Sequence, residues 1–119
     1  MYQILPETSG HLIGLKATGT LTTSDFEVLQ SEIDRLLAQA APACVLLDWT
    51  ELHGWDARGE QRAFTFWLGA WSQIDKVAVI AEETFLSDVV QLGVALSHST
   101  VRHFYPGEAG SARAWLAGA

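Results

Sequence analysis

Cysteine and basic residues are scarce in this sequence of 119 residues, and their scarcity excludes several classes of protein. The single cysteine, Cys44, has no partner for an internal disulfide and no second thiol for a CxxC metal or redox site. Seven Lys and Arg residues stand against 14 acidic ones, which gives a formal net charge of −7 at pH 7. The basic residues are scattered singly, without the basic stripe of a nucleic-acid-binding protein or the basic face of a membrane-surface helix. We therefore expect no nucleic-acid partner.

Long apolar runs are also missing from the sequence. No stretch reaches the roughly 18 apolar residues of a membrane-spanning helix, and no charged leader precedes a hydrophobic segment. Hydrophobic residues still make up 49% of the chain and charged residues 18%, a composition that disordered tails do not have. A chain of this length buries about two-thirds of its unfolded surface, which is enough for one core. We expect a single cytoplasmic domain over residues 1–119 with no integral membrane segment.

Hydrophobic periodicity predicts strands that alternate with helices after an opening hairpin. Ser24 and Glu27 have the spacing of a capping box at the start of the first helix, and Asp56 can cap the second. The expected strands are 2–6, 11–18, 44–49, 76–81 and 101–105, and the expected helices are 24–41, 56–72, 84–96 and 108–116. This β-β-α-β-α-β-α-β-α order is typical of an α/β sheet with right-handed crossovers.

The predicted architecture is a five-stranded mixed sheet, antiparallel only at the opening hairpin, with about four helices over its faces. The 44–49 strand is apolar on both faces, as a central parallel strand between helices would be. The residues expected in the core come from the strands and the first helix: Ile13, Leu36, Val45, Leu47, Val79 and Phe104.

The common catalytic fingerprints are absent from the turns where an α/β fold usually carries them. There is no GxGxxG, no Gly-rich loop ending in Gly-Lys-Ser/Thr and no GxSxG elbow. His53 with Asp56, and His98 with His103, form pairs, whereas metal sites need three or four convergent ligands. We therefore expect no metal, and a surface or capping role for His53 is favoured over an acid–base role.

Cys44 and the carboxylates after the fourth expected strand also have structural explanations. Cys44 opens a buried strand, where it is expected to act as a small apolar side chain rather than a reactive thiolate. Glu82 and Glu83 could act as a pair of acid and base, but Glu83 or Thr84 more simply caps the next helix. We expect a protein that is not an enzyme and that carries no cofactor.

Tryptophan is the residue type in excess, with five in the chain. Three of them fall between residues 55 and 71, together with two phenylalanines. One helical stripe of core side chains accounts for Phe64, Trp67, Leu68 and Trp71, but Phe66 and Trp55 fall outside it. The next helix is also apolar on more than one face. The cluster is therefore either core, or part of two neighbouring helices that present apolar surface to a ligand or a partner.

The segment from Leu47 to Asp56, the aromatic helix after it and the 76–81 strand resemble the SpoIIAA-like family, small bacterial proteins of the STAS-like superfamily. The most specific piece is the expected loop His53-Gly54-Trp55-Asp56, and the likeness extends over essentially the whole chain. The resemblance implies a right-handed βα superhelix, which lipid-carrying CRAL-TRIO domains share. It also suggests the binding of small non-polar ligands.

The better-known relatives are anti-sigma-factor antagonists that are switched by phosphorylation of a serine where the second helix begins. Their pattern there is Asp-Ser-Ser-Gly, and this sequence has Asp56-Ala57-Arg58-Gly59 at the matching positions. Both hydroxyl groups are absent, and Arg58 stands at the expected phosphoacceptor position. The resemblance therefore does not carry the phosphoserine switch to this chain.

We expect a non-enzymatic binding module that holds a small non-polar, lipid-like molecule in a cleft between the second and third helices. The acidic exterior favours a neutral or weakly polar ligand over an anionic one, and Gly93 is expected to let the helices approach or to leave space for a guest. The alternative is a regulatory protein–protein interaction module, or a homodimer, that uses the same apolar surface. The expected ligand-binding residues come from both helices and the loop before them: Trp55, Phe64, Trp67, Leu68, Trp71, Phe85, Val89 and Leu92.

Overall fold

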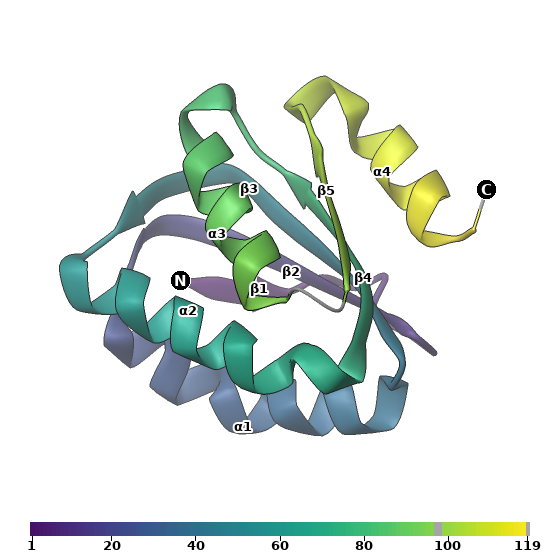
Figure 1. Cartoon of the computed structure of the whole chain (residues 1–119), viewed down its shortest axis with the longest axis horizontal. Helices are drawn as coiled ribbons and strands as arrows, with labels where there is room; N and C mark the ends of the chain where they lie inside the picture. The colour runs from purple at the N-terminus through teal and green to yellow at the C-terminus, as the bar shows by residue number, and fades with distance from the viewer. Residues whose placement is uncertain (97–98, 119) are drawn as a thin grey trace.

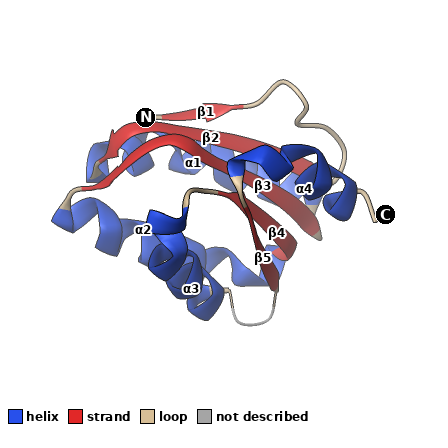
Figure 2. Ribbon diagram, turned by 90° about the horizontal axis from the view of Figure 1, so that it is seen from above, coloured by secondary structure: helices blue, strands red, loops and turns tan. Residues whose placement is uncertain are grey.

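One mixed β-sheet organises the chain. The computed structural model describes residues 1–96 and 99–118 and, within these ranges, not the side chains of Leu29 and Trp71. In the described ranges five strands form one sheet in sequential order: β1 (Tyr2–Ile4), β2 (Leu12–Leu21), β3 (Ala43–Trp55), β4 (Ile74–Ile80) and β5 (Thr100–Phe104). β1 pairs antiparallel with β2, and the following neighbours pair parallel, as Figure 2 shows from edge to edge. The predicted topology is confirmed.

The helices cover the two faces of this sheet unequally. α1 (Thr23–Ala40), α2 (Ala57–Ala70) and α3 (Leu86–Ala95) each connect two consecutive parallel strands, whereas α4 (Ala109–Leu116) follows β5. Short 3-10 turns occupy η1 (Trp71–Gln73), η2 (Glu83–Phe85) and η3 (Pro106–Glu108). α2 contacts both α1 and α3 and lies between them (Figure 1). This is the right-handed βα superhelix expected of the fold.

Alternate side chains of the central strands enter two cores on opposite faces of the sheet. On β3, Val45 and Leu47 belong to the larger core, which also contains side chains of α1, α2 and α3. Leu46 belongs to the smaller core with Ala112 and Leu116 of α4. Burial on both faces explains why β3 and β4 are apolar without alternation. Of the predicted core residues, the structure buries Ile13, Val45, Leu47, Val79 and Phe104 and half-buries Leu36.

The third strand is longer than predicted. It continues from Trp49 to Trp55, where the sequence had favoured a loop, and it stays paired with β2 as far as Leu21 opposite Trp55. Two register shifts in this pairing accompany the extension, and Gly54 has a φ of 146°. Irregular pairing of this kind lets a strand carry polar residues and a glycine that weaken a strand pattern. Trp55 therefore lies at the end of a strand rather than in a loop.

The first helix begins earlier than predicted and has a different cap. Thr22 and Asp25 form the capping box, and the predicted pair of Ser24 and Glu27 does not. The Thr22 N–H donates to Asp25 Oδ2 at 2.8 Å, and the Asp25 N–H donates to Thr22 Oγ1 at 3.4 Å. The two candidate pairs have the same spacing in the sequence, so the local pattern could not choose between them.

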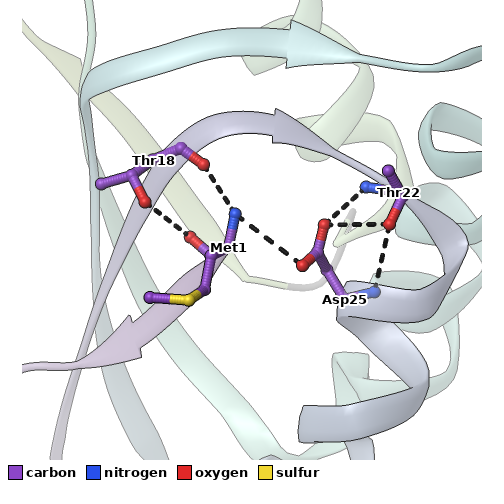
Figure 3. A network of polar contacts seen from close by, with 4 residues as sticks. All are labelled: Met1, Thr18, Thr22 and Asp25. Carbon is purple, nitrogen blue, oxygen red and sulfur yellow. Dashed lines mark hydrogen bonds and ion pairs between the residues drawn. The ribbon is translucent and has the colours of Figure 1, made fainter.

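The same aspartate ties the first strand to the first helix (Figure 3). The amino nitrogen of Met1 lies 3.8 Å from Asp25 Oδ1 and donates to the Thr18 carbonyl oxygen at 2.6 Å. Next to it, the Tyr2 ring packs edge to face on Phe26 of α1, with ring centroids 5.3 Å apart. These contacts hold the edge strand so that Tyr2 reaches the interior.

The buried face of α2 differs from the predicted stripe. Phe66, expected outside the stripe, is buried and packs near Phe26 of α1 with ring centroids 6.1 Å apart. Phe64 and Leu68, expected inside it, are exposed. The buried residues of the helix are Gly59, Ala63, Phe66, Trp67 and Ala70. The buried face of α2 therefore combines three small residues with two large aromatic ones.

The second helix starts in direct contact with the end of β2. The Asp56 N–H donates to the Leu21 carbonyl oxygen at 3.1 Å, and Asp56 Oδ1 accepts from the Gly59 N–H at 2.6 Å, which confirms Asp56 as the cap. A Cβ atom at residue 59 would overlap the Leu21 carbonyl oxygen and lie 2.9 Å from Asp56 Oδ1. Residue 59 must therefore be glycine for α2 to begin here.

Replacement of Gly59 by alanine should lower the free energy of unfolding by roughly 1–3 kcal/mol, because the added methyl group overlaps backbone atoms. Gly69→Ala is the matched control in the same helix, since a Cβ there meets nothing within 4 Å. The control should raise the free energy of unfolding by about 0.5–1 kcal/mol through helix propensity. Urea unfolding followed by circular dichroism measures both, and equal effects of the two variants would contradict the close contact.

Candidate functional site

A small cavity lies between α2, α3 and the carboxyl half of β3. Its volume is about 40 Å³, room for roughly three water-sized groups. A whole lipid chain does not fit in this conformation. The lining residues are Tyr2, Trp49, Trp55, Glu60, Ala63, Phe64, Trp67, Asp88, Gln91, Leu92 and Ala95. The walls are therefore aromatic and aliphatic, with three polar side chains among them.

Half of the predicted ligand-binding residues line this cavity. They are Trp55, Phe64, Trp67 and Leu92. Phe85 does not line it, but its ring meets Trp55 and Trp49 edge to face, with centroids 5.9 and 6.2 Å away. Phe85 therefore packs against two of the residues that line the cavity.

The remaining predicted residues lie elsewhere. Val89 is buried in the larger core and Leu68 is 49% exposed, and neither lines the cavity. The side chain of Trp71 lies outside the described part of the structure, as does His98. A Cβ at Gly93 would meet nothing within 4 Å, so no close helix contact requires this glycine, and Gly93 does not line the cavity.

Several lining residues were not expected from the sequence. Trp49 lies on the same face of β3 as Val45 and Leu47, so strand alternation could have predicted that it faces the interior. Glu60 and Asp88 lie one helical turn from Phe64 and Leu92, so their spacing also carries a signal, although they are polar. Tyr2 reaches the cavity only through its antiparallel pairing with β2, which no local pattern shows.

The two carboxyl groups make the cavity electronegative. Partial burial raises the pKa of Asp88, and the negative charge of Glu60 raises it further. Burial also raises the pKa of the Tyr2 phenol far above its ordinary value, with a contribution from the charge of Asp25. No basic side chain is among the described lining residues, and no ion pair in the described ranges involves Glu60 or Asp88. This negative charge is uncompensated.

Two buried indole groups at the cavity lack hydrogen-bond acceptors. The Nε1 atoms of Trp49 and Trp55 are buried and have no partner among the described residues, and Trp49 is only 3% exposed. A buried donor without a partner costs about 1–3 kcal/mol. Both residues line the cavity, but neither Nε1 atom is accessible to a water-sized probe, so neither donor faces the cavity in this conformation.

The other candidate residues from the sequence, His53, His103, Cys44 and Glu82, do not line the cavity. His103 Nε2 is 2.8 Å from the Ala81 carbonyl oxygen, and His53 is exposed. Burial raises the pKa of the Cys44 thiol, and Asp75 raises it further, which favours the neutral form. Glu83 and Thr84 lie within η2, and α3 begins after Phe85 without a side-chain capping bond, so the predicted cap by Glu83 or Thr84 is wrong. Among residues 1–96 and 99–118, no three His, Cys, Asp or Glu side chains gather to hold a metal.

The comparisons with known proteins agree on the fold. The SpoIIAA-like family model matches residues 12–117. An uncharacterized protein of the DUF3478 family with a SpoIIAA-like fold, from Shewanella loihica PV-4, superposes with a TM-score of 0.74 at 22% identity, over 98% of this chain and 92% of that one. The anti-sigma factor antagonist SpoIIAA in its unphosphorylated form gives 0.66 at 13% identity, over 97% and 98%. These identities show the fold alone. No curated protein matches the sequence, and no described helix is long and apolar enough to cross a membrane.

Replacement of Asp88 by asparagine should raise the melting temperature at neutral pH. A raised carboxyl pKa means that the folded state holds the proton more tightly than the unfolded state, so stability falls as pH rises from about 4 through the raised value. Asparagine removes this decline in stability, and the difference in melting temperature between the variant and the wild-type protein should vanish near pH 3. Thermal melts across this range measure the effect, with Asp34→Asn on the exposed face of α1 as control. A pH-independent difference would show that the charge of Asp88 is not the cause.

Proposed function

This chain belongs to the SpoIIAA-like family, and on that premise we propose that it is a non-enzymatic binding module that holds a small, largely apolar guest between α2 and α3. The observation that supports the proposal best is the cavity wall formed by Trp49 and Trp55. Their rings meet at 84° with centroids 5.2 Å apart, and both indole N–H groups are unpaired within the described structure. A guest that fills the corner gains dispersion contacts with these rings.

The size of the cavity limits which part of a guest is bound. A compact group of a few non-hydrogen atoms fits the 40 Å³ present, and a longer, lipid-like chain requires α3 to move away from α2. The outer face of α3 is free to allow this, since Val90 and Val94 are 66% and 62% exposed. We therefore favour a compact apolar group inside the cavity, with any longer tail at its mouth.

The surroundings of the residues that could perform catalysis favour a binding function over an enzymatic one. The Cys44 thiol is held toward its neutral form by burial. The His103 ring is engaged by a backbone carbonyl, and Glu82 and Glu83 are exposed. The cavity itself contains no nucleophile next to a base among the described residues.

A second candidate function is protein–protein interaction through the exposed apolar surface of α2 and α3. Leu86, Val90 and Val94 follow one another at every fourth residue on α3, and all three are exposed. Phe64 and Leu68 add to this surface from α2. One protein of similar fold is an anti-sigma factor antagonist, which supports a regulatory partner. Arg58 is exposed at the start of α2, so any such partner is engaged without a phosphoserine at this position.

Proton–nitrogen correlation NMR tests the ligand proposal directly, because each tryptophan indole gives one N–H signal. Titration with the neutral alcohol 3,3-dimethyl-1-butanol should move the indole signals of Trp49 and Trp55. The Trp115 signal should stay in place, since this residue packs with Phe104 in the core on the opposite face. Saturable shifts of the two cavity indoles are the expected result.

A variant that fills the cavity should abolish these shifts. Ala63 lines the cavity and is 9% exposed, and valine there adds two methyl groups to a space of about 40 Å³. Ala38→Val makes the same change at an exposed site on α1 and should leave the shifts intact. If no indole signal of the wild-type protein moves, the aromatic cluster is core and the proposal fails.

Sedimentation analysis of the oligomeric state tests the homodimeric form of the second candidate function. A dimer of the wild-type protein should become monomeric when Val90 is replaced by glutamate, because a charge would enter an apolar interface. Val28→Glu is the matched control, since Val28 is 76% exposed on α1. A wild-type protein that stays monomeric at high concentration would exclude the homodimer.

A further inference from the structure

We propose that the group bound in the cavity is a methylated ammonium, so that the guest is a small organic cation of the choline class. The inference rests on the proposed function and adds the charge of the guest. It follows from one juxtaposition: five aromatic side chains and two uncompensated carboxyl groups line the same small cavity.

The aromatic side chains surround the cavity from three elements. Tyr2 comes from β1, Trp49 and Trp55 come from β3, and Phe64 and Trp67 come from α2. The faces of aromatic rings attract cations through their quadrupole, and tryptophan does so most strongly. Trp49 and Trp55 pack edge to face, with their ring planes at 84°. A trimethylammonium group has four non-hydrogen atoms, which is more than a volume of about 40 Å³ holds, so α3 must move away from α2 to admit it.

The carboxyl groups supply the second attraction. Glu60 on α2 and Asp88 on α3 approach from different helices, closely enough that the charge of Glu60 raises the pKa of Asp88. Neither is neutralised by a basic residue in the described ranges. A cation between the helices would offset this repulsion, whereas an anion would increase it. The net charge of −7 acts in the same direction at longer range.

The indole N–H groups of Trp49 and Trp55 add no preference for an oxygen atom on the guest, because neither is accessible from the cavity in this conformation. The competing explanation is that the carboxyl groups are simply solvated.

The experiment compares choline with 3,3-dimethyl-1-butanol, in which carbon replaces the charged nitrogen and the shape and hydroxyl group remain. Both are titrated into the whole protein, and the indole N–H signals of Trp49 and Trp55 report binding. Choline should bind roughly tenfold more tightly or better, because the cation gains its attraction to several rings and two carboxylates. The double variant Glu60→Gln, Asp88→Asn should lower the choline affinity to that of the alcohol. Glu83→Gln, an exposed residue outside the cavity, should leave the choline affinity unchanged.

The outcomes separate this inference from the proposed function. Equal affinity for choline and the alcohol overturns the inference that the guest is a cation and leaves the proposed apolar binding site intact. If neither molecule binds, both the inference and the proposed function are overturned. Circular dichroism melts of the double variant show whether it folds, and loss of choline affinity in a folded variant supports the cation site. An unchanged choline affinity in that variant contradicts it.

Discussion

The contact of Gly59 with the Leu21 carbonyl oxygen determines where α2 begins, and the cavity depends on that position. Asp56 links the same two segments by accepting from the Gly59 N–H and donating its own N–H to Leu21. With the start of α2 fixed, Glu60, Ala63 and Trp67 follow along one side of the helix toward the cavity. β3 ends in the same corner, because its pairing with β2 persists to Trp55. A shift in the position where α2 begins would move the whole wall that α2 contributes to the cavity.

The sequence predicts the parts of the fold that depend on local pattern. The apolar 44–49 stretch predicts a doubly buried strand, and Asp56 predicts the start of α2, because each signal involves neighbouring residues. The extension of β3 to Trp55 was not predictable, since residues 50–54 hold strand geometry through pairing with β2. The burial of Phe66 and the exposure of Leu68 were not predictable for a related reason: the packing of α2 against α1 and α3 selects the buried side of the helix, and apolar spacing alone does not show it.

The residues of the candidate site also divide into those that a local pattern predicts and those that it does not. Trp55, Phe64, Trp67 and Leu92 were expected because tryptophan excess and helical spacing are visible in the chain. Tyr2 was not, since it depends on the edge-strand pairing and on the contact of Asp25 with Met1. Glu60 and Asp88 were overlooked because polar residues do not count in an apolar pattern, although their spacing matches that of the lining residues.

The cavity carries features that are unfavourable in the free protein. Two buried indole donors are unpaired, and two carboxyl groups face each other's charge. A domain selected for stability alone would remove both, and such local conflicts are typical of functional sites. A methylated ammonium between the helices would offset the repulsion of the two carboxyl groups. The aromatic side chains then have a role beyond filling space.

A crystal structure of the protein grown with choline tests this account most directly. The account predicts the quaternary nitrogen within about 6 Å of the ring centroids of Trp49 and Trp55, between the helices that carry Glu60 and Asp88. A cavity without choline would contradict it.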